Sequence, residues 1–117
     1  SGMHELSLAL SIAEIAEEEA RRYGGGRVEA IHLRIGPLAG VVKEALLTAF
    51  PIAAQGPAVD GSRLVIEEVP LVVYCAACHA ERSPEPDGWF QCPVCHAPTP
   101  EIRQGRELEV AALELEP

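Results

Sequence analysis

The chain has 117 residues, the size of one small domain with room for a minor appended module. Its net charge is −9, and its one lysine and eight arginines form no basic cluster, which argues against nucleic-acid binding. No apolar run approaches the roughly 18 residues that a membrane span needs, so we expect no membrane insertion.

Two helices and one strand are predicted in the first half of the chain. From Leu6 to Tyr23, apolar residues recur at three- and four-residue steps, which predicts an amphipathic helix. This apolar stripe comprises Leu8, Ile12, Ile15, Ala16, Ala20 and Tyr23. Residues 28–35 alternate as a half-buried strand does, with His32 directed to solvent. Residues 41–54 predict a second helix, which Pro51 is expected to kink or end.

The second half adds strands around a segment that contains all the cysteines. Residues 64–73 predict a strand that Pro70 interrupts, and residues 108–115 predict a last strand whose phase break implies a bulge or two-sided burial. The order of elements predicts an α+β fold, a small mixed sheet with two helices on one face. We assign residues 3–73 and 106–117 to this domain and residues 74–105 to an inserted zinc-ribbon-like module.

The four cysteines form the pattern C-x2-C-x13-C-x2-C, with members Cys75, Cys78, Cys92 and Cys95. Each C-x-x-C pair can bend into a knuckle that directs two thiolates to one point. Four thiolates suit Zn(II) and close its coordination sphere, which leaves no position for an activated water. The zinc is therefore expected to be structural, and we do not expect an enzyme.

The same residues allow two other interpretations. His79 and His96 complete two C-x-x-C-H sequences, the pattern of c-type haem attachment. A dihaem protein needs a large apolar shell, yet the chain has one Met, two Phe, one Trp and two Tyr. A disulfide framework is the other alternative. We favour zinc over both, and the colour of the protein would distinguish zinc from haem.

A second metal site is predicted at Met3-His4-Glu5. If the chain starts at Met3, its α-amine, amide nitrogens and the His4 imidazole can close adjacent chelate rings, an arrangement that favours Ni(II) or Cu(II). Glu5 could add a carboxylate or stabilise the start of the helix. An ordinary exposed histidine is the plain alternative.

Several motifs occur in the order seen in HypA/HybF proteins, and the chain resembles that family over nearly its whole length. The motifs are Met3-His4-Glu5-Leu6-Ser7, Arg34-Ile35-Gly36, Leu38-Ala39-Gly40-Val41, Ile66-Glu67-Glu68-Val69-Pro70, the paired C-x-x-C with Cys92-Pro93, and Gly105-Arg106-Glu107-Leu108. The resemblance implies a cytoplasmic nickel metallochaperone for [NiFe]-hydrogenase, and in some organisms for urease. By the same resemblance, His4 and Glu5 bind nickel and the four cysteines bind structural zinc.

The resemblance also implies two partners, a HypB-type GTPase and the hydrogenase large subunit, and leaves a homodimer open. A zinc-ribbon interaction adaptor without metal transfer is the alternative function. The chain departs from the family where His79 and His96 replace a common glycine, although histidine tolerates positive φ and the knuckles should form. Pro51 is a further departure. Ser1-Gly2 resembles a tag remnant, which would move the free amine away from Met3.

Overall fold

The computed structural model describes residues 2–88 and 90–117. Their contacts divide the chain into two compact units. The first unit comprises the described residues up to Arg34 together with residues 41–67 and 109–117, and the second comprises Ile35–Gly40 and Glu68–Leu108. Compactness does not test whether a segment folds by itself, so the predicted domain boundaries stay a prediction.

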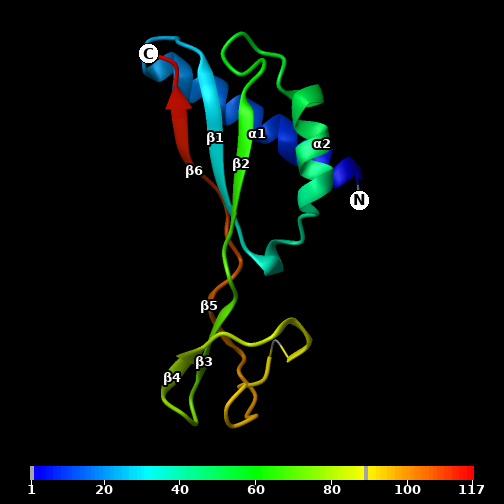
Figure 1. The fold of residues 1–117 in the computed structure, drawn as a ribbon, viewed down its shortest axis with the longest axis vertical. Coiled ribbons are helices and arrows are strands. Elements are labelled where there is room, and N and C mark those ends of the chain that lie inside the picture. The colour runs from blue at the N-terminus through cyan, green and yellow to red at the C-terminus, as the bar shows by residue number, and fades with distance from the viewer. Residues whose placement is uncertain (1, 89) are drawn as a thin grey trace. The chain divides into compact units, whose positions relative to one another are not determined.

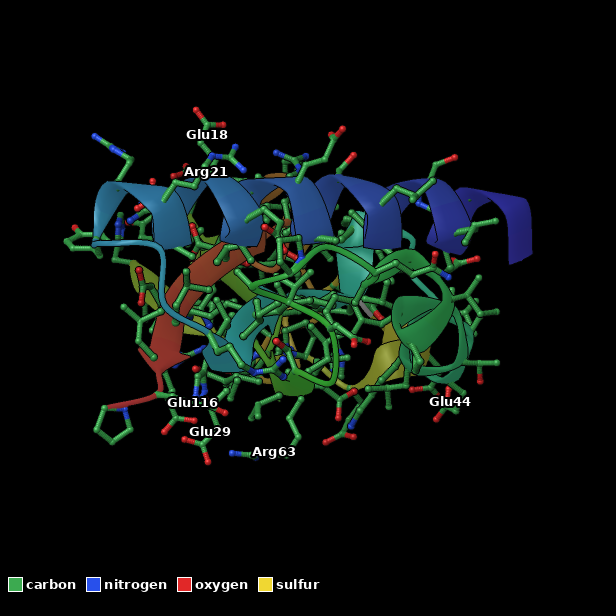
Figure 2. The ribbon with its side chains drawn as sticks, turned by 90° about the horizontal axis from the view of Figure 1, so that it is seen from above. Glu18, Arg21, Glu29, Glu44, Arg63 and Glu116 are labelled. Atoms are coloured by element: carbon green, nitrogen blue, oxygen red, sulfur yellow. The ribbon has the colours of Figure 1, made fainter. Side chains whose placement is uncertain are left out.

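The first unit contains two helices and a three-stranded sheet (Figure 1). The helices are α1 (Gly2–Arg22) and α2 (Lys43–Ala53), and they pack against each other. The strands are β1 (Val28–Ile35), β2 (Arg63–Glu68) and β6 (Leu108–Leu115), in the order β2-β1-β6. Helix α1 lies across one face of this sheet (Figure 2). The predicted α+β class and the return of the last strand to the first sheet are confirmed.

Helix α1 buries a narrow stripe of small residues. Ala9, Ile12, Ala16 and Ala20 are at most 3% exposed and recur at helical spacing, so the helix approaches its neighbours closely. The expected burial of Ile15 and Tyr23 is wrong, since their exposed fractions are 46% and 73%. These two residues lie beside the alanine stripe. The helix ends where expected, at glycines with positive φ.

Helix α1 begins earlier than predicted, and Met3-His4-Glu5 forms part of its first turn. The helix predicted from Leu6 onward left this segment outside it. The helix includes it because Glu5 lies one turn before Ala9 on the same face and is fully buried. The backbone of the predicted nickel site at Met3-His4-Glu5 is therefore helical in the structure.

Strand β1 and helix α2 lie close to their predicted positions in the chain. The bounds of β1 are as predicted. On the face expected to be solvated, the His32 side chain is half-buried, with an exposed fraction of 37%, and Ala30 is fully buried. Helix α2 passes through Pro51 and ends two residues later at Ala53. Pro51 has no N–H to give to the Leu47 carbonyl, but little helix follows it, and the helix closes through the Ala54 N–H, which donates to the Phe50 carbonyl at 2.8 Å.

The second unit contains an antiparallel sheet in the order β4-β3-β5. Its strands are β3 (Val72–Cys75), β4 (Ala80–Arg82) and β5 (Glu101–Gln104), and short 3-10 turns span Pro37–Ala39 and Pro86–Gly88. The single strand expected over residues 64–73 is two strands, β2 and β3, which belong to different sheets. Pro70 separates them because it has no N–H to give to a sheet.

Charged side chains project from opposite sides of the first unit. Figure 2 shows Glu18 and Arg21 pointing outward from α1, while Glu29, Arg63 and Glu116 lie on the opposite side.

Among the residues that the structure describes, no helix combines the length and apolar character needed to span a membrane.

Candidate metal centres

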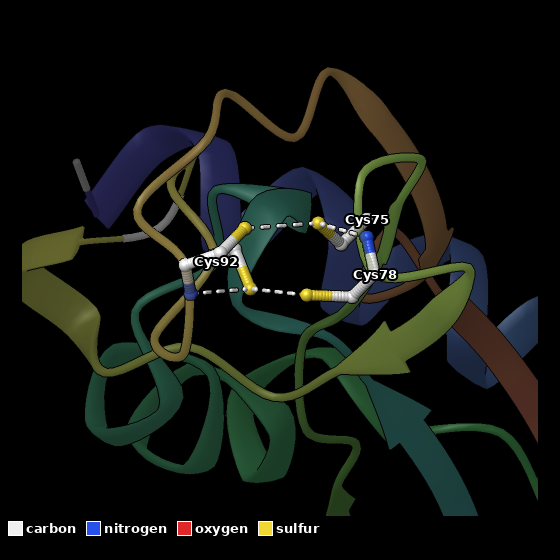
Figure 3. A group of neighbouring side chains, drawn as sticks. Cys75, Cys78 and Cys92 are labelled. Carbon is white, nitrogen blue, oxygen red and sulfur yellow. Dashed lines mark hydrogen bonds between the residues drawn. The ribbon is translucent and has the colours of Figure 1, made fainter.

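The structure brings the four cysteines to one point in the second unit. Each offers a sulfur, and the four sulfur atoms all lie within 4.8 Å of one another. The Sγ atoms of Cys75 and Cys95 are 3.5 Å apart, and those of Cys78 and Cys92 are 4.0 Å apart. Figure 3 shows the thiols of Cys75 and Cys78 facing the loop that carries Cys92. The predicted convergence of the two C-x-x-C pairs is confirmed.

These distances test which chemistry the cluster can support. A zinc ion with Zn–S bonds of about 2.3 Å has its sulfurs about 3.8 Å apart, which the observed separations match. Disulfides would need S–S separations of about 2.05 Å, and all four cysteines are free. Two haems would each need one C-x-x-C pair to itself, and two facing pairs this close leave no space for porphyrins. The residues present therefore fit a four-thiolate metal site.

Backbone N–H groups support the two knuckles. The Cys78 N–H points to the Cys75 sulfur at 3.4 Å, and the N–H groups of Val94 and Cys95 both point to the Cys92 sulfur at 3.4 Å. The second knuckle is closed by the His96 N–H, which donates to the Cys92 carbonyl at 2.9 Å. Such donors stabilise negative sulfur and orient it before the metal arrives.

His79 and His96 occupy the special backbone position of each knuckle. Their φ angles are 53° and 65°, and both side chains are exposed. The expectation that the knuckles form with histidine at positive φ is confirmed. Glycine adopts this conformation without a Cβ penalty, whereas histidine pays for it.

The pKa values of the thiols differ across the cluster. The N–H of Cys95 lowers the pKa of Cys92 to about 6, assisted by the Val94 N–H and the Arg82 side chain and opposed by burial. For Cys95, the Ala97 N–H lowers the pKa, but the thiols of Cys75 and Cys78, together with burial, raise it to about 12. One thiolate is thus prepared for a metal, while another thiol must lose a proton when the metal binds. Metal affinity should therefore rise with pH.

The predicted nickel residues lie in the first turn of α1 and point in different directions. His4 is exposed. The Glu5 side chain is fully buried, and its Oε2 accepts a hydrogen bond from the Val42 N–H at 3.1 Å. Consecutive helical side chains diverge by about 100°, which explains the contrast. Ser1 lies outside the described residues.

Glu5 joins the start of α1 to the segment that precedes α2. The Val42 N–H is the largest influence on its carboxyl group and lowers its pKa, while burial opposes that effect. The carboxylate is therefore ionised at neutral pH next to the exposed His4. The sequence showed an acidic residue at this position, but its burial and its partner depend on tertiary packing.

Arg82 lies at the cysteine cluster, although no sequence motif indicates it. This residue ends β4, which pairs with β3, and its side chain contacts the Cys78 and Cys92 thiols. The sequence places an arginine four residues after Cys78, but only the register of the β3–β4 hairpin shows which way it faces.

Taken together, the α+β first unit and the four-thiol second unit define a small protein with a cysteine cluster able to hold a metal ion. Comparison with known proteins gives the family. A family model described as "Hydrogenase/urease nickel incorporation, metallochaperone, hypA" matches residues 3–115. The chain belongs to the HypA family.

Relatives named hydrogenase maturation factor HypA align along almost the whole chain. The protein of Chloroflexus aurantiacus (strain ATCC 29366) is 51% identical over 112 residues, which cover 96% of this chain and 98% of that protein. The protein of a Roseiflexus species is 50% identical over 114 residues, covering 97% and 93%. The solution structure of the Ni metallochaperone HypA from Helicobacter pylori has a TM-score of 0.67 at 23% identity, covering 95% and 96%, which supports the fold.

Proposed function

We propose that this protein binds Ni(II) at the start of α1 and delivers it for the maturation of [NiFe]-hydrogenase, and in some organisms of urease. The family match and the names of the relatives support the nickel-delivery role. The observation that carries the location of the site is the exposed His4 in the first turn of α1, beside the buried carboxylate of Glu5.

The first turn of a helix provides suitable nickel ligands. Its first four backbone N–H groups have no partner inside the helix, so amide nitrogens near His4 would be able to release their protons to solvent and bind Ni(II) as amidates. With the His4 imidazole and the amine of Met3, these nitrogens would form the nitrogen-rich set that favours Ni(II). The Val42 N–H holds the Glu5 carboxylate, so Glu5 acts by its charge and by anchoring the turn. An exposed terminal site also permits release by ligand exchange.

The four-cysteine cluster would hold a structural Zn(II) in this account. All coordination positions of zinc would be filled by Cys75, Cys78, Cys92 and Cys95. The proposed partners are a HypB-type GTPase and the hydrogenase large subunit, and the proposed location is the cytoplasm. The acidic net charge of −9 favours a basic partner surface.

The test is an equilibrium Ni(II) titration of zinc-loaded protein prepared with Met3 as its first residue. His4→Ala should abolish tight nickel binding, while the matched control His32→Ala should bind like the parent, because His32 is a half-exposed strand residue paired with Glu114 at 3.1 Å. The form that begins with Ser1 should bind more weakly. Equal nickel affinity in all four proteins would contradict the proposed site.

A further inference from the structure

One arginine, Arg82, lies beside the four-cysteine cluster, and a metal ion bound there would explain its position. In the β3–β4 hairpin, Cys75 pairs with Ala80 and Val73 pairs with Arg82. Directly paired residues lie on one face of a sheet, and so do residues two apart along a strand. Arg82 therefore lies on the same face of the hairpin as Cys75, toward the cysteine cluster.

The buried part of Arg82 lacks an ordinary protein partner. Its Nε atom is buried, and no hydrogen-bond acceptor is found for it within residues 2–88 and 90–117. Buried arginine N–H groups normally have hydrogen-bond acceptors, and a buried N–H group without an acceptor destabilises the folded protein. The sulfurs of Cys78 and Cys92 lie against this side chain, and they raise its pKa. The cluster is therefore the acceptor that the arginine faces.

The hydrogen bonds of the knuckles show why a side-chain donor is needed. The Cys92 sulfur receives two backbone N–H groups and the Cys75 sulfur receives one. In the part of the chain that the structure describes, no backbone N–H hydrogen bond to the Cys78 sulfur is found. Ala97, two residues after Cys95, donates to that cysteine, whereas Ala80, two residues after Cys78, is paired in the sheet.

We propose that Arg82 is a positioning residue of the zinc site, whose guanidinium donates to the sulfurs of Cys78 and Cys92 and so holds the two knuckles together. Four thiolates around Zn(II) carry a net charge of −2, and a nearby cation offsets part of it. Arg103, on β5 of the same unit, cannot replace Arg82. It pairs with Glu81 and Glu101 and stacks on the Tyr74 ring at 4.4 Å.

The test measures zinc transfer from the zinc-loaded full chain to excess chelator. Arg82→Met keeps the aliphatic stem but removes the donors, and we expect transfer to accelerate by about tenfold or more. Arg103→Met is the matched control and should transfer zinc at the parent rate. An Arg82→Met rate equal to that of the parent would overturn the proposal.

A spectroscopic readout separates hydrogen bonding to sulfur from simple packing. In Co(II)-substituted protein, loss of N–H donors should shift the thiolate-to-cobalt charge-transfer bands to lower energy in Arg82→Met and leave them unchanged in Arg103→Met. If Arg82→Met does not fold, Arg82→Lys provides the measurement, because lysine keeps the charge but lacks the planar fork that spans two acceptors. Parent-like bands and a parent-like transfer rate in Arg82→Lys would then refute the two-sulfur contact.

Discussion

Gly36→Ala should destabilise the second unit strongly, because two backbone segments meet at this glycine. A Cβ atom at position 36 would overlap the carbonyl group of Gly105 and approach its Cα to 2.8 Å. The same contact is held by two hydrogen bonds of 2.8 Å, from the Gly36 N–H to the Glu107 carbonyl and from the Leu38 N–H to the Gly105 carbonyl. The atoms that this Cβ would meet all belong to the backbone of Gly105, so no flexible side chain could move aside.

The size of the effect follows from these contacts. Separating the segments would weaken two backbone hydrogen bonds and strain the packing around them, and together these predict a loss of about 2–5 kcal/mol in the free energy of unfolding. Gly26→Ala is the matched control, since nothing lies within 4 Å of a Cβ there. Its effect should stay within about 0.5 kcal/mol.

Urea unfolding of the zinc-loaded proteins, followed by circular dichroism and by zinc release, measures this difference. The parent and Gly26→Ala should share one transition midpoint, and Gly36→Ala should unfold and release zinc at lower urea. Equal midpoints for the two alanine variants would show that the close approach of Gly36 and Gly105 is not a constraint, and would refute the reasoning.

Two further predictions concern the metal centres. His79→Gly should leave the stability of the zinc-loaded protein unchanged or raise it by up to about 1 kcal/mol, because glycine relieves the positive φ of 53°; faster zinc loss in this variant would instead show that the imidazole supports the site. Glu5→Gln should be less stable than the parent to urea at neutral pH, because the Val42 N–H loses an ionised acceptor. Since the folded pKa of Glu5 is lowered from 4.5, this difference should be complete above that pH and shrink as the pH falls through the lower folded value. If the urea midpoints of Glu5→Gln and the parent differed by the same amount at all pH values, this would contradict the ionised state assigned to the Glu5 carboxylate.

The cysteine cluster could be predicted from the sequence because its geometry is almost local. Each C-x-x-C spacing determines a knuckle, and four soft ligands of one kind indicate one metal. The bounds of β1 were predictable for the same reason, since alternation over residues 28–35 is a local property. The positive φ of His79 and His96 also followed from knuckle geometry.

Features that depend on tertiary packing were not predictable. The burial of Glu5 needs the segment at Val42, which is distant in sequence, and Arg82 acquires its direction only from the register of β3 and β4. Ile15 and Tyr23 fitted the apolar stripe of a helix, yet the unit buries the neighbouring alanines and leaves both exposed. Periodicity identifies a helix but does not define which part of its apolar arc finds a partner.

X-ray absorption at the nickel and zinc K-edges of the nickel- and zinc-loaded protein that begins at Met3 tests the central claim most directly. We expect one nickel with only nitrogen and oxygen ligands, including imidazole from His4, while zinc keeps four sulfurs. Nickel–sulfur scattering, accompanied by loss of zinc, would place nickel in the cysteine cluster and contradict the account.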